Sequence, residues 1–205
     1  MKNLIKLQRQ LKTIKMKITK TNFESLMTIE SDIFDDERGY FFESYNKGKF
    51  DTIGINIDFV LDTESFSKKS VLRGFHFQKP PFPQGKLIRV VYGRVLDVVI
   101  DLRKKSPTYG RWFSIVLSAA NKKMLWIPPG FAHGFLVLED DTILSYKLTA
   151  FHNKEAESGI LWSDSDLNVD WKFDKYGIER PILSEKDKKL PLFKEIDKKN
   201  YFIGY

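Results

Sequence analysis

The sequence contains no cysteine and only three histidines, His76, His133 and His152. Without cysteine, the chain has no disulfides, no thiolate metal site and no cysteine nucleophile. Its apolar runs are far shorter than the ~18 residues typical of a membrane span, and it shows no hydrophobic segment of a secretory signal. These absences predict a soluble, cytoplasmic protein without a membrane partner.

The excess of positive charge lies at one end of the chain. The net charge is +7, from 34 basic and 27 acidic residues, and residues 1–20 hold the whole excess because they contain seven Lys or Arg and no acid. A basic helical face here could contact RNA or an anionic membrane, but appended termini more often have no such role. We interpret residues 1–15 as a basic N-terminal extension, disordered or helical, and residues 16–205 as a single domain without a nucleic-acid partner.

From Met16 onward, short segments rich in Val, Ile, Phe, Tyr and Thr alternate with turn residues, a pattern typical of all-β folds. Residues 86–91 and 95–102 are predicted to form a hairpin around Gly93. The close spacing of the predicted strands indicates an all-β double-sheet jelly roll, with a few short helices near the C-terminus after a helix start at Ser184. Further strands are expected at 112–118, 124–127, 134–138 and 142–148.

His76 is the most informative histidine, because it lies in a predicted strand over residues 71–78. Arg73 and His76 would fall on opposite faces of a regular strand, unless Gly74 relaxes the alternation. An imidazole titrates near neutral pH and can act as a general base, the alternative being a core histidine bonded to a carbonyl. A metal is disfavoured because Gln78, which would complete a His-x-His pair, is a poor ligand. No serine-hydrolase elbow, phosphate loop or dinucleotide fingerprint is present.

Four separated motifs occur in order: DERGYFFE at 36–43, LRGFHFQ at 72–78, QGKLIRVV at 84–91 and WIPPGFAHGF at 126–135. Over about residues 16–192 the chain resembles the dTDP-4-dehydrorhamnose 3,5-epimerase family. The resemblance implies a homodimer with the cupin-like jelly roll, a double-stranded β-helix, that needs neither metal nor cofactor. It also implies that the protein epimerises a nucleotide-linked 4-keto-6-deoxy sugar for surface polysaccharide synthesis.

Epimerisation beside a ketone needs a base, a group that stabilises the enolate oxygen, and an acid on the opposite face. By resemblance, His76 is the base, Tyr146 is the acid and Lys86 lies near the sugar carbonyl. Asp187, in the Ser-Glu-Lys-Asp segment 184–187, is implied to orient His76. The alternatives are a core aromatic for Tyr146, a solvated lysine for Lys86 and a capping box that places Asp187 on its own helix start.

The resemblance also implies residues that bind the sugar and the diphosphate. An arginine guanidinium suits a diphosphate because it donates two hydrogen bonds to paired oxygens. Taken singly, each charged residue would more often belong to a surface ion pair, and His133 could be structural. These expected binding residues are Arg38, Glu43, Arg73, His133, Glu157 and Lys186.

Two departures from the family concern the nucleotide. Leu61, Asp62 and Thr63 replace a Gln-x-Asn segment, and His152 replaces a tyrosine that stacks on thymine. One interpretation is a changed base, with GDP as the leading substitute, or a heptose in place of the hexose; the other is drift within a thymidine-specific enzyme. The loss of the tyrosine also leaves open a single epimerase at C3 or C5. A 3,4-ketoisomerase and a non-catalytic sugar-nucleotide-binding barrel are further alternatives.

Overall fold

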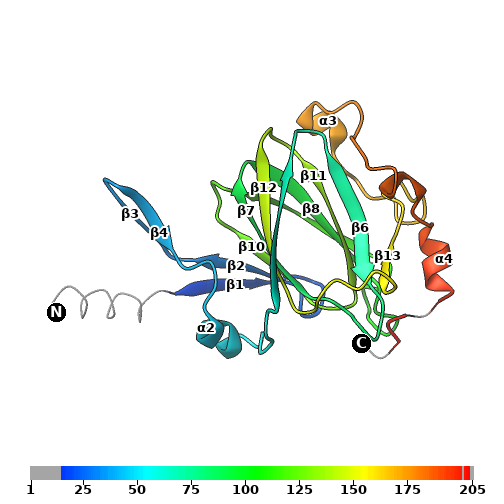
Figure 1. Cartoon of the computed structure of the whole chain (residues 1–205), viewed down its shortest axis with the longest axis horizontal. Helices are drawn as coiled ribbons and strands as arrows, with labels where there is room; N and C mark the ends of the chain where they lie inside the picture. Colours follow the sequence, from blue (N-terminus) through cyan, green and yellow to red (C-terminus); the bar gives the residue numbers. More distant parts are fainter. Residues whose placement is uncertain (1–14, 200, 204–205) are drawn as a thin grey trace.

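Two facing antiparallel sheets form the body of the computed structural model, which describes residues 15–199 and 201–203 (Figure 1). The first sheet has the order β1 (Met16–Lys20), β2 (Met27–Ser31), β10 (Met124–Ile127), β7 (Lys86–Tyr92), β12 (Thr142–Leu148) and β5 (Leu61–Ser67). The second has the order β13 (Glu157–Gly159), β6 (Leu72–Gln78), β11 (Phe131–Val137), β8 (Arg94–Asp101) and β9 (Trp112–Ser118). The prediction of an all-β jelly roll is confirmed.

The predicted hairpin over residues 86–102 is wrong, because β7 and β8 belong to different sheets. Gly93, with φ +78°, turns the chain from one sheet to the other, and a Cβ there would lie 2.2 Å from the Thr142 hydroxyl oxygen. The eight residues of β8 show why: all but Arg94 are buried, since β8 lies between β11 and β9 with apolar cores on both faces. A continuous apolar run is typical of a strand that is buried on both faces, rather than of a hairpin with one solvent-exposed face.

The apolar side chains form three clusters, one between the sheets and one on the outer face of each sheet. The inner cluster includes Ile88, Val99 and Phe135. The C-terminal segment covers the second sheet, where Trp171 and Phe202 pack onto β6 and β8 residues. The segment around α2 (Lys47–Thr52) covers part of the first sheet.

Short helices follow the strands, as predicted: α3 (Phe173–Tyr176), the 3₁₀ turn η1 (Asp187–Lys189) and α4 (Phe193–Asp197). The sequence reasoning missed α2, whose N-cap Asn46 accepts a hydrogen bond from the Lys49 amide at 3.3 Å. No helix in the described part of the chain is long and apolar enough to cross a membrane. Residues 1–14 of the predicted extension lie outside the described residues.

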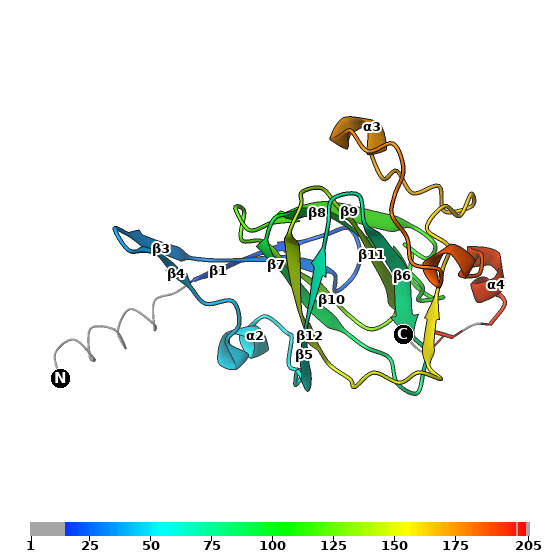
Figure 2. The same cartoon turned by 45° about the horizontal axis from the view of Figure 1, so that its top comes forward.

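A two-stranded arm, β3 (Ile33–Asp36) and β4 (Gly39–Phe42), projects away from the barrel (Figures 1 and 2). Its large apolar side chains are exposed, with Tyr40 at 55% and Phe41 at 54%. An isolated hairpin is marginally stable in water, so an exposed apolar arm of this kind is typical of an element that packs against another surface.

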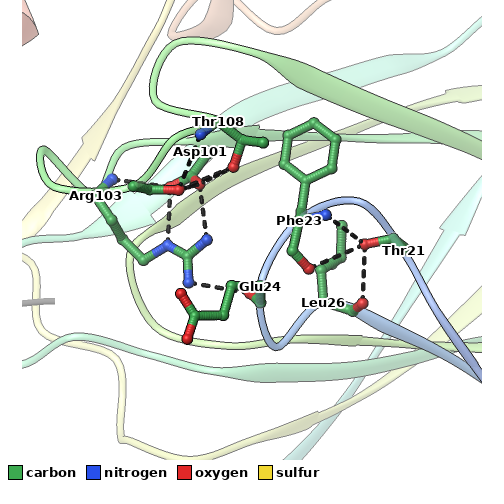
Figure 3. Close-up of polar contacts among 8 residues, drawn as sticks. Thr21, Phe23, Glu24, Leu26, Asp101, Arg103 and Thr108 are labelled. Atoms are coloured by element: carbon green, nitrogen blue, oxygen red, sulfur yellow. Dashed lines mark hydrogen bonds and ion pairs between the residues drawn. The ribbon is translucent and has the colours of Figure 1, made fainter.

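A buried ion pair fixes the β1–β2 turn to the barrel (Figure 3). The Arg103 guanidinium donates to the Asp101 carboxylate at 2.9 and 2.7 Å and to the Glu24 carbonyl at 3.0 Å. The Thr108 hydroxyl donates to the same carboxylate at 2.6 Å. The Asp101 carboxylate is thus occupied by structural contacts, whereas Asp97, the other acidic residue of β8, pairs with His133, which lines the pocket described next.

Candidate active site

A pocket of about 190 Å³ opens between the two sheets and collects side chains from β5, β6, β7, β11 and β12. Six of the side chains that line it were predicted from the sequence: Thr63, Arg73, His76, Lys86, His133 and Tyr146. Gln84, Phe135 and Leu148 complete the lining. Three of the four sequence motifs, at 72–78, 84–91 and 126–135, therefore meet at one place, whereas the motif at 36–43 contributes nothing to the lining.

A bulge in β6 puts Arg73 and His76 into the same pocket. Arg73 pairs with Phe135 and His76 with His133, so two residues of β6 face the single residue Gly134 of β11. Gly74, with φ +113°, makes this possible: a Cβ there would lie 2.6 Å from the Gly134 Cα. The expectation that Gly74 relaxes the strand alternation is confirmed.

His76 and Asp187 form a close pair. The His76 Nε2 lies 2.6 Å from an Asp187 carboxylate oxygen, and Asp187 is almost completely buried. Burial by itself raises the pKa of the Asp187 carboxyl, but its hydrogen bond with His76 and the charge of that ring outweigh burial and hold the pKa below its ordinary value. Because an ionised carboxylate only accepts, Nε2 carries a proton and donates it to Asp187. When the ring is neutral, its lone pair therefore lies at Nδ1.

The geometry also decides between the two alternatives for the Ser-Glu-Lys-Asp segment. The Ser184 hydroxyl accepts a hydrogen bond from the Asp187 amide at 3.1 Å, which is half of a capping box. The Asp187 side chain, however, turns toward His76 rather than back to the helix start. Ser184 thus shapes the turn, and Asp187 remains available to orient the imidazole.

Tyr146 and Lys86 are the other residues of the pocket that were expected to take part in catalysis. Burial raises the pKa of the Tyr146 phenol, although a hydrogen bond with Ser65 at 3.0 Å opposes the shift, so the phenol keeps its proton at neutral pH. Burial lowers the pKa of the Lys86 ammonium to about 8, although the carboxylates of Asp97 and Glu157 oppose the shift. The ammonium has no hydrogen bond or ion pair with any residue that the structure describes.

A second histidine–carboxylate pair lies beside the first. The His133 Nε2 is 2.9 Å from an Asp97 oxygen, and both residues are buried. Burial lowers the pKa of His133, against the effect of the Asp97 charge. The sequence reasoning missed Asp97, although a carboxylate inside an apolar strand was itself a signal, because a buried charge needs a partner.

Three predicted residues gather outside the pocket lining. Glu157, on β13, pairs with Lys186 at 2.5 Å and lies 3.7 Å from His152. Burial raises the pKa of Glu157, but Lys186 outweighs it and the net shift is downward. The electrostatic influence of Glu157 on Lys86 places this group of charges near the pocket.

The remaining predicted residues are not brought into the pocket by this chain. Leu61 lies on the same face of β5 as Thr63 by strand alternation, whereas Asp62 faces the other way and pairs with Lys147 at 2.8 Å. Arg38 lies on the arm, where it pairs with Asp36. Glu43 follows the arm and pairs with Lys49.

The sequence model of the dTDP-4-dehydrorhamnose 3,5-epimerase family matches residues 20–195. The chain belongs to this family. A family member from Shigella flexneri is 46% identical over 189 residues, which are 92% of this chain and 100% of the relative. The solved structure of the epimerase from Legionella pneumophila, in complex with dTDP-4-keto-L-rhamnose, has a TM-score of 0.87 and 40% identity, covering 93% of this chain and 100% of that one.

A second family structure, the dTDP-4-dehydrorhamnose 3,5-epimerase of Bacillus anthracis with TDP and pyrophosphate bound, has a TM-score of 0.83 and 44% identity. It covers 87% of this chain and 100% of that chain. The resemblance indicated by the four motifs is confirmed, and the protein is an isomerase of the carbohydrate epimerase type.

Proposed function

We propose that this protein inverts C3 and C5 of a dTDP-linked 4-keto-6-deoxyhexose. The observation that carries the proposal is one pocket that presents His76, oriented by Asp187, together with Lys86 and Tyr146. Pockets for drug-sized ligands usually run from about 300 to 1,000 Å³, so a space of about 190 Å³ suits only part of a nucleotide sugar. The sugar ring is the part that these groups would act on.

In the proposed reaction, the His76 Nδ1 removes a proton from the carbon beside the C4 ketone. The electron pair of that C–H bond forms a double bond to C4 of the sugar, and the C4 oxygen becomes an enolate oxygen beside the Lys86 ammonium. The Tyr146 hydroxyl then gives its proton to the opposite face of the carbon, and the phenolate recovers a proton as His76 releases its own. Two such rounds invert both carbons.

The choice of dTDP is supported by the printed substrates of the relatives, since the Legionella protein is bound to dTDP-4-keto-L-rhamnose and the Bacillus protein to TDP. Thr63 in the pocket and the exposed His152 nevertheless differ from the family pattern. A GDP-linked sugar therefore remains the rival substrate to be tested directly. Surface polysaccharide synthesis stays a prediction of the resemblance, and a cytoplasmic location stays a prediction from the sequence.

The deciding experiment is NMR in D₂O with dTDP-linked and GDP-linked 4-keto-6-deoxyhexoses in parallel. We expect deuterium at C3 and C5 of the dTDP sugar only. Label at a single carbon would show a single epimerase, and label on the GDP sugar alone would overturn the choice of nucleotide. Binding without exchange for either sugar would show a non-catalytic barrel.

Replacing the base should abolish the exchange. For His76→Ala we expect exchange to fall on the order of 10²- to 10⁴-fold, the usual contribution of a general base. Circular dichroism and the melting temperature check that the variant is folded. Exchange at the wild-type rate in a folded variant would remove His76 from the mechanism.

Replacing the acid should separate the two half-reactions. Tyr146→Phe keeps the ring but loses the proton, so we expect inversion to fall at least about tenfold more than deuterium exchange on the original face. Both rates are read from the same NMR time course. Equal losses of exchange and inversion would mean that Tyr146 does not act as the separate acid.

We infer that the active form is a homodimer in which each arm reaches the other subunit. Arg38 is expected to bind substrate but lies on an arm that leaves its own barrel (Figure 2). The arm exposes Ile33, Phe34, Tyr40 and Phe41, a large apolar area for one hairpin. Both features are accounted for if a second copy covers the arm and receives Arg38 at its pocket.

A further inference from the structure

Gln78 is the last residue of β6, two positions after His76 and on the same face of the strand. Its side chain is 5% exposed. A buried primary amide must satisfy two N–H donors and one carbonyl acceptor. All three of these needs are met by backbone groups of two loops.

One loop, residues 79–85, joins β6 to β7, and the other, residues 149–156, joins β12 to β13. The Gln78 Nε2 donates to the Phe82 carbonyl at 2.9 Å and to the Phe151 carbonyl at 3.2 Å. The Gln78 Oε1 accepts from the Asn153 amide at 2.7 Å. One side chain therefore fastens both loops to the strand that carries His76.

The two phenylalanines of these loops contribute little packing, because Phe82 and Phe151 are 47% and 69% exposed. Hydrogen bonds hold them instead. The Gln84 side chain donates to the Ala150 carbonyl at 2.7 Å, and Gly85 and Thr149 exchange bonds of 2.8 and 3.1 Å.

Both loops end at groups of the candidate site. Gln84, near the end of the first loop, lines the pocket, and Lys86 is the first residue of β7 after this loop. His152 lies on the second loop, and Glu157 begins β13 at its end. A change in the position of either loop would therefore move Gln84 of the pocket lining, or His152 and Glu157, which the family resemblance assigns to substrate binding.

We propose that Gln78 is a positioning residue that sets the two loops for binding the nucleotide diphosphate part of the substrate. The inference rests on the proposed function, since it assigns that part of the substrate to the surface outside the small pocket. Gln78 is not part of the pocket lining, and its hydrogen bonds go to the two loops rather than to the base His76. Its loss should therefore weaken binding more than it slows the chemical step.

The test is Gln78→Glu, which keeps the shape but loses both donors and sets a carboxylate oxygen against two carbonyls. We expect the Kd of dTDP, measured by titration calorimetry, and the KM of the sugar to rise about tenfold or more, with kcat changed less than about threefold. Hydrogen–deuterium exchange of residues 79–85 and 149–156 should become faster without any ligand.

Asn121 offers a matched control on the turn between β9 and β10. Its amide oxygen accepts from the Ser118 and Lys123 amides at 3.1 and 3.0 Å, and its nitrogen donates to the Val116 carbonyl at 2.9 Å. Asn121→Asp makes the same chemical change at a turn that contributes nothing to the pocket lining. It should lower the melting temperature as well but leave the Kd and KM unchanged.

A Kd for Gln78→Glu within twofold of wild type, or an equal loss in Asn121→Asp, would overturn the proposal. If Gln78→Glu does not fold, Gln78→Met gives a neutral side chain of similar length, and an unchanged Kd in the folded Met variant overturns it equally. If wild-type protein binds no dTDP, the proposed function fails instead. In that case, hydrogen–deuterium exchange in the two loops still tests Gln78 independently of the substrate. Exchange rates in Gln78→Glu equal to those of wild type would reject the positioning role.

Discussion

At the scale of single residues, Lys86 gives the pocket a charge that is lost within an accessible pH range. Burial lowers the pKa of the Lys86 ammonium to about 8, so the fraction of the protein that carries this cation declines as the pH rises through that value. We therefore expect kcat/KM to fall as the pH rises above about 8. The raised pKa of Tyr146 puts the loss of its proton at higher pH. A pH–rate profile measures this limb directly.

Lys86→Arg separates the charge from the amine, because a guanidinium stays protonated throughout this range. We expect the basic limb to move upward by at least about one pH unit even if the maximal rate falls. Lys147→Arg is the control, since the Lys147 ammonium pairs with Asp62 away from the pocket. A limb that stays near pH 8 in Lys86→Arg would assign it to another group.

The resemblance identified the residues that carry the expected chemistry, and Asp187 as the partner of His76, but Asp97 was missed. His76, Lys86 and Tyr146 were identified through a resemblance, and they meet in one pocket. Asp97 was missed because its meaning depends on His133, which lies 36 positions further along the chain. Spatial pairing of this kind cannot be deduced from local sequence pattern.

At the scale of elements, the bulge of β6 is the feature that assembles the pocket. Gly74→Ala would place a methyl 2.6 Å from backbone atoms of β11 at a φ of +113°. We expect a loss of about 2–4 kcal/mol in the free energy of unfolding, combining backbone strain with the clash. Urea unfolding measures it, and kcat should fall as Arg73 and His76 shift.

Gly54→Ala is the control for backbone strain alone. Gly54 has φ +87°, but a Cβ there meets no atom within 4 Å. It should cost only about 1 kcal/mol and spare activity. Equal losses in the two variants would mean that close approach of β6 to β11 is not the reason for glycine at position 74.

Element existence was predicted better than element pairing. The strands at 112–118, 124–127 and 142–148 were predicted with the observed bounds. The expected strand at 134–138 begins earlier, at Phe131. The predicted pairing of β7 with β8 was wrong. It followed the rule that two strands close in sequence and joined by a glycine turn usually form a hairpin. Only the burial of both faces of β8, which depends on the C-terminal segment, sends the two strands to different sheets.

At the scale of the whole molecule, the arm and the pocket make the homodimer testable through activity. In the proposed dimer, His76 of one subunit and Arg38 of the other serve the same site. His76→Ala and Arg38→Ala homodimers should both be weakly active or inactive. Light scattering should show that wild type and both variants have the mass of two chains, and a monomeric mass would contradict the dimer at once.

Mixing the two variants distinguishes an arm that acts on the partner from one that acts on its own barrel. When the chains are refolded together, half of the dimers should be mixed, and each mixed dimer should contain one site with both His76 and Arg38 intact. Activity should therefore return to about a quarter of wild type, because one of two sites is restored in half of the dimers. If Arg38 served its own barrel, every site would still lack one of the two groups. No recovery above the separate variants would then place Arg38 in the same subunit as its His76 or outside the site, and the exposed apolar arm would need another explanation.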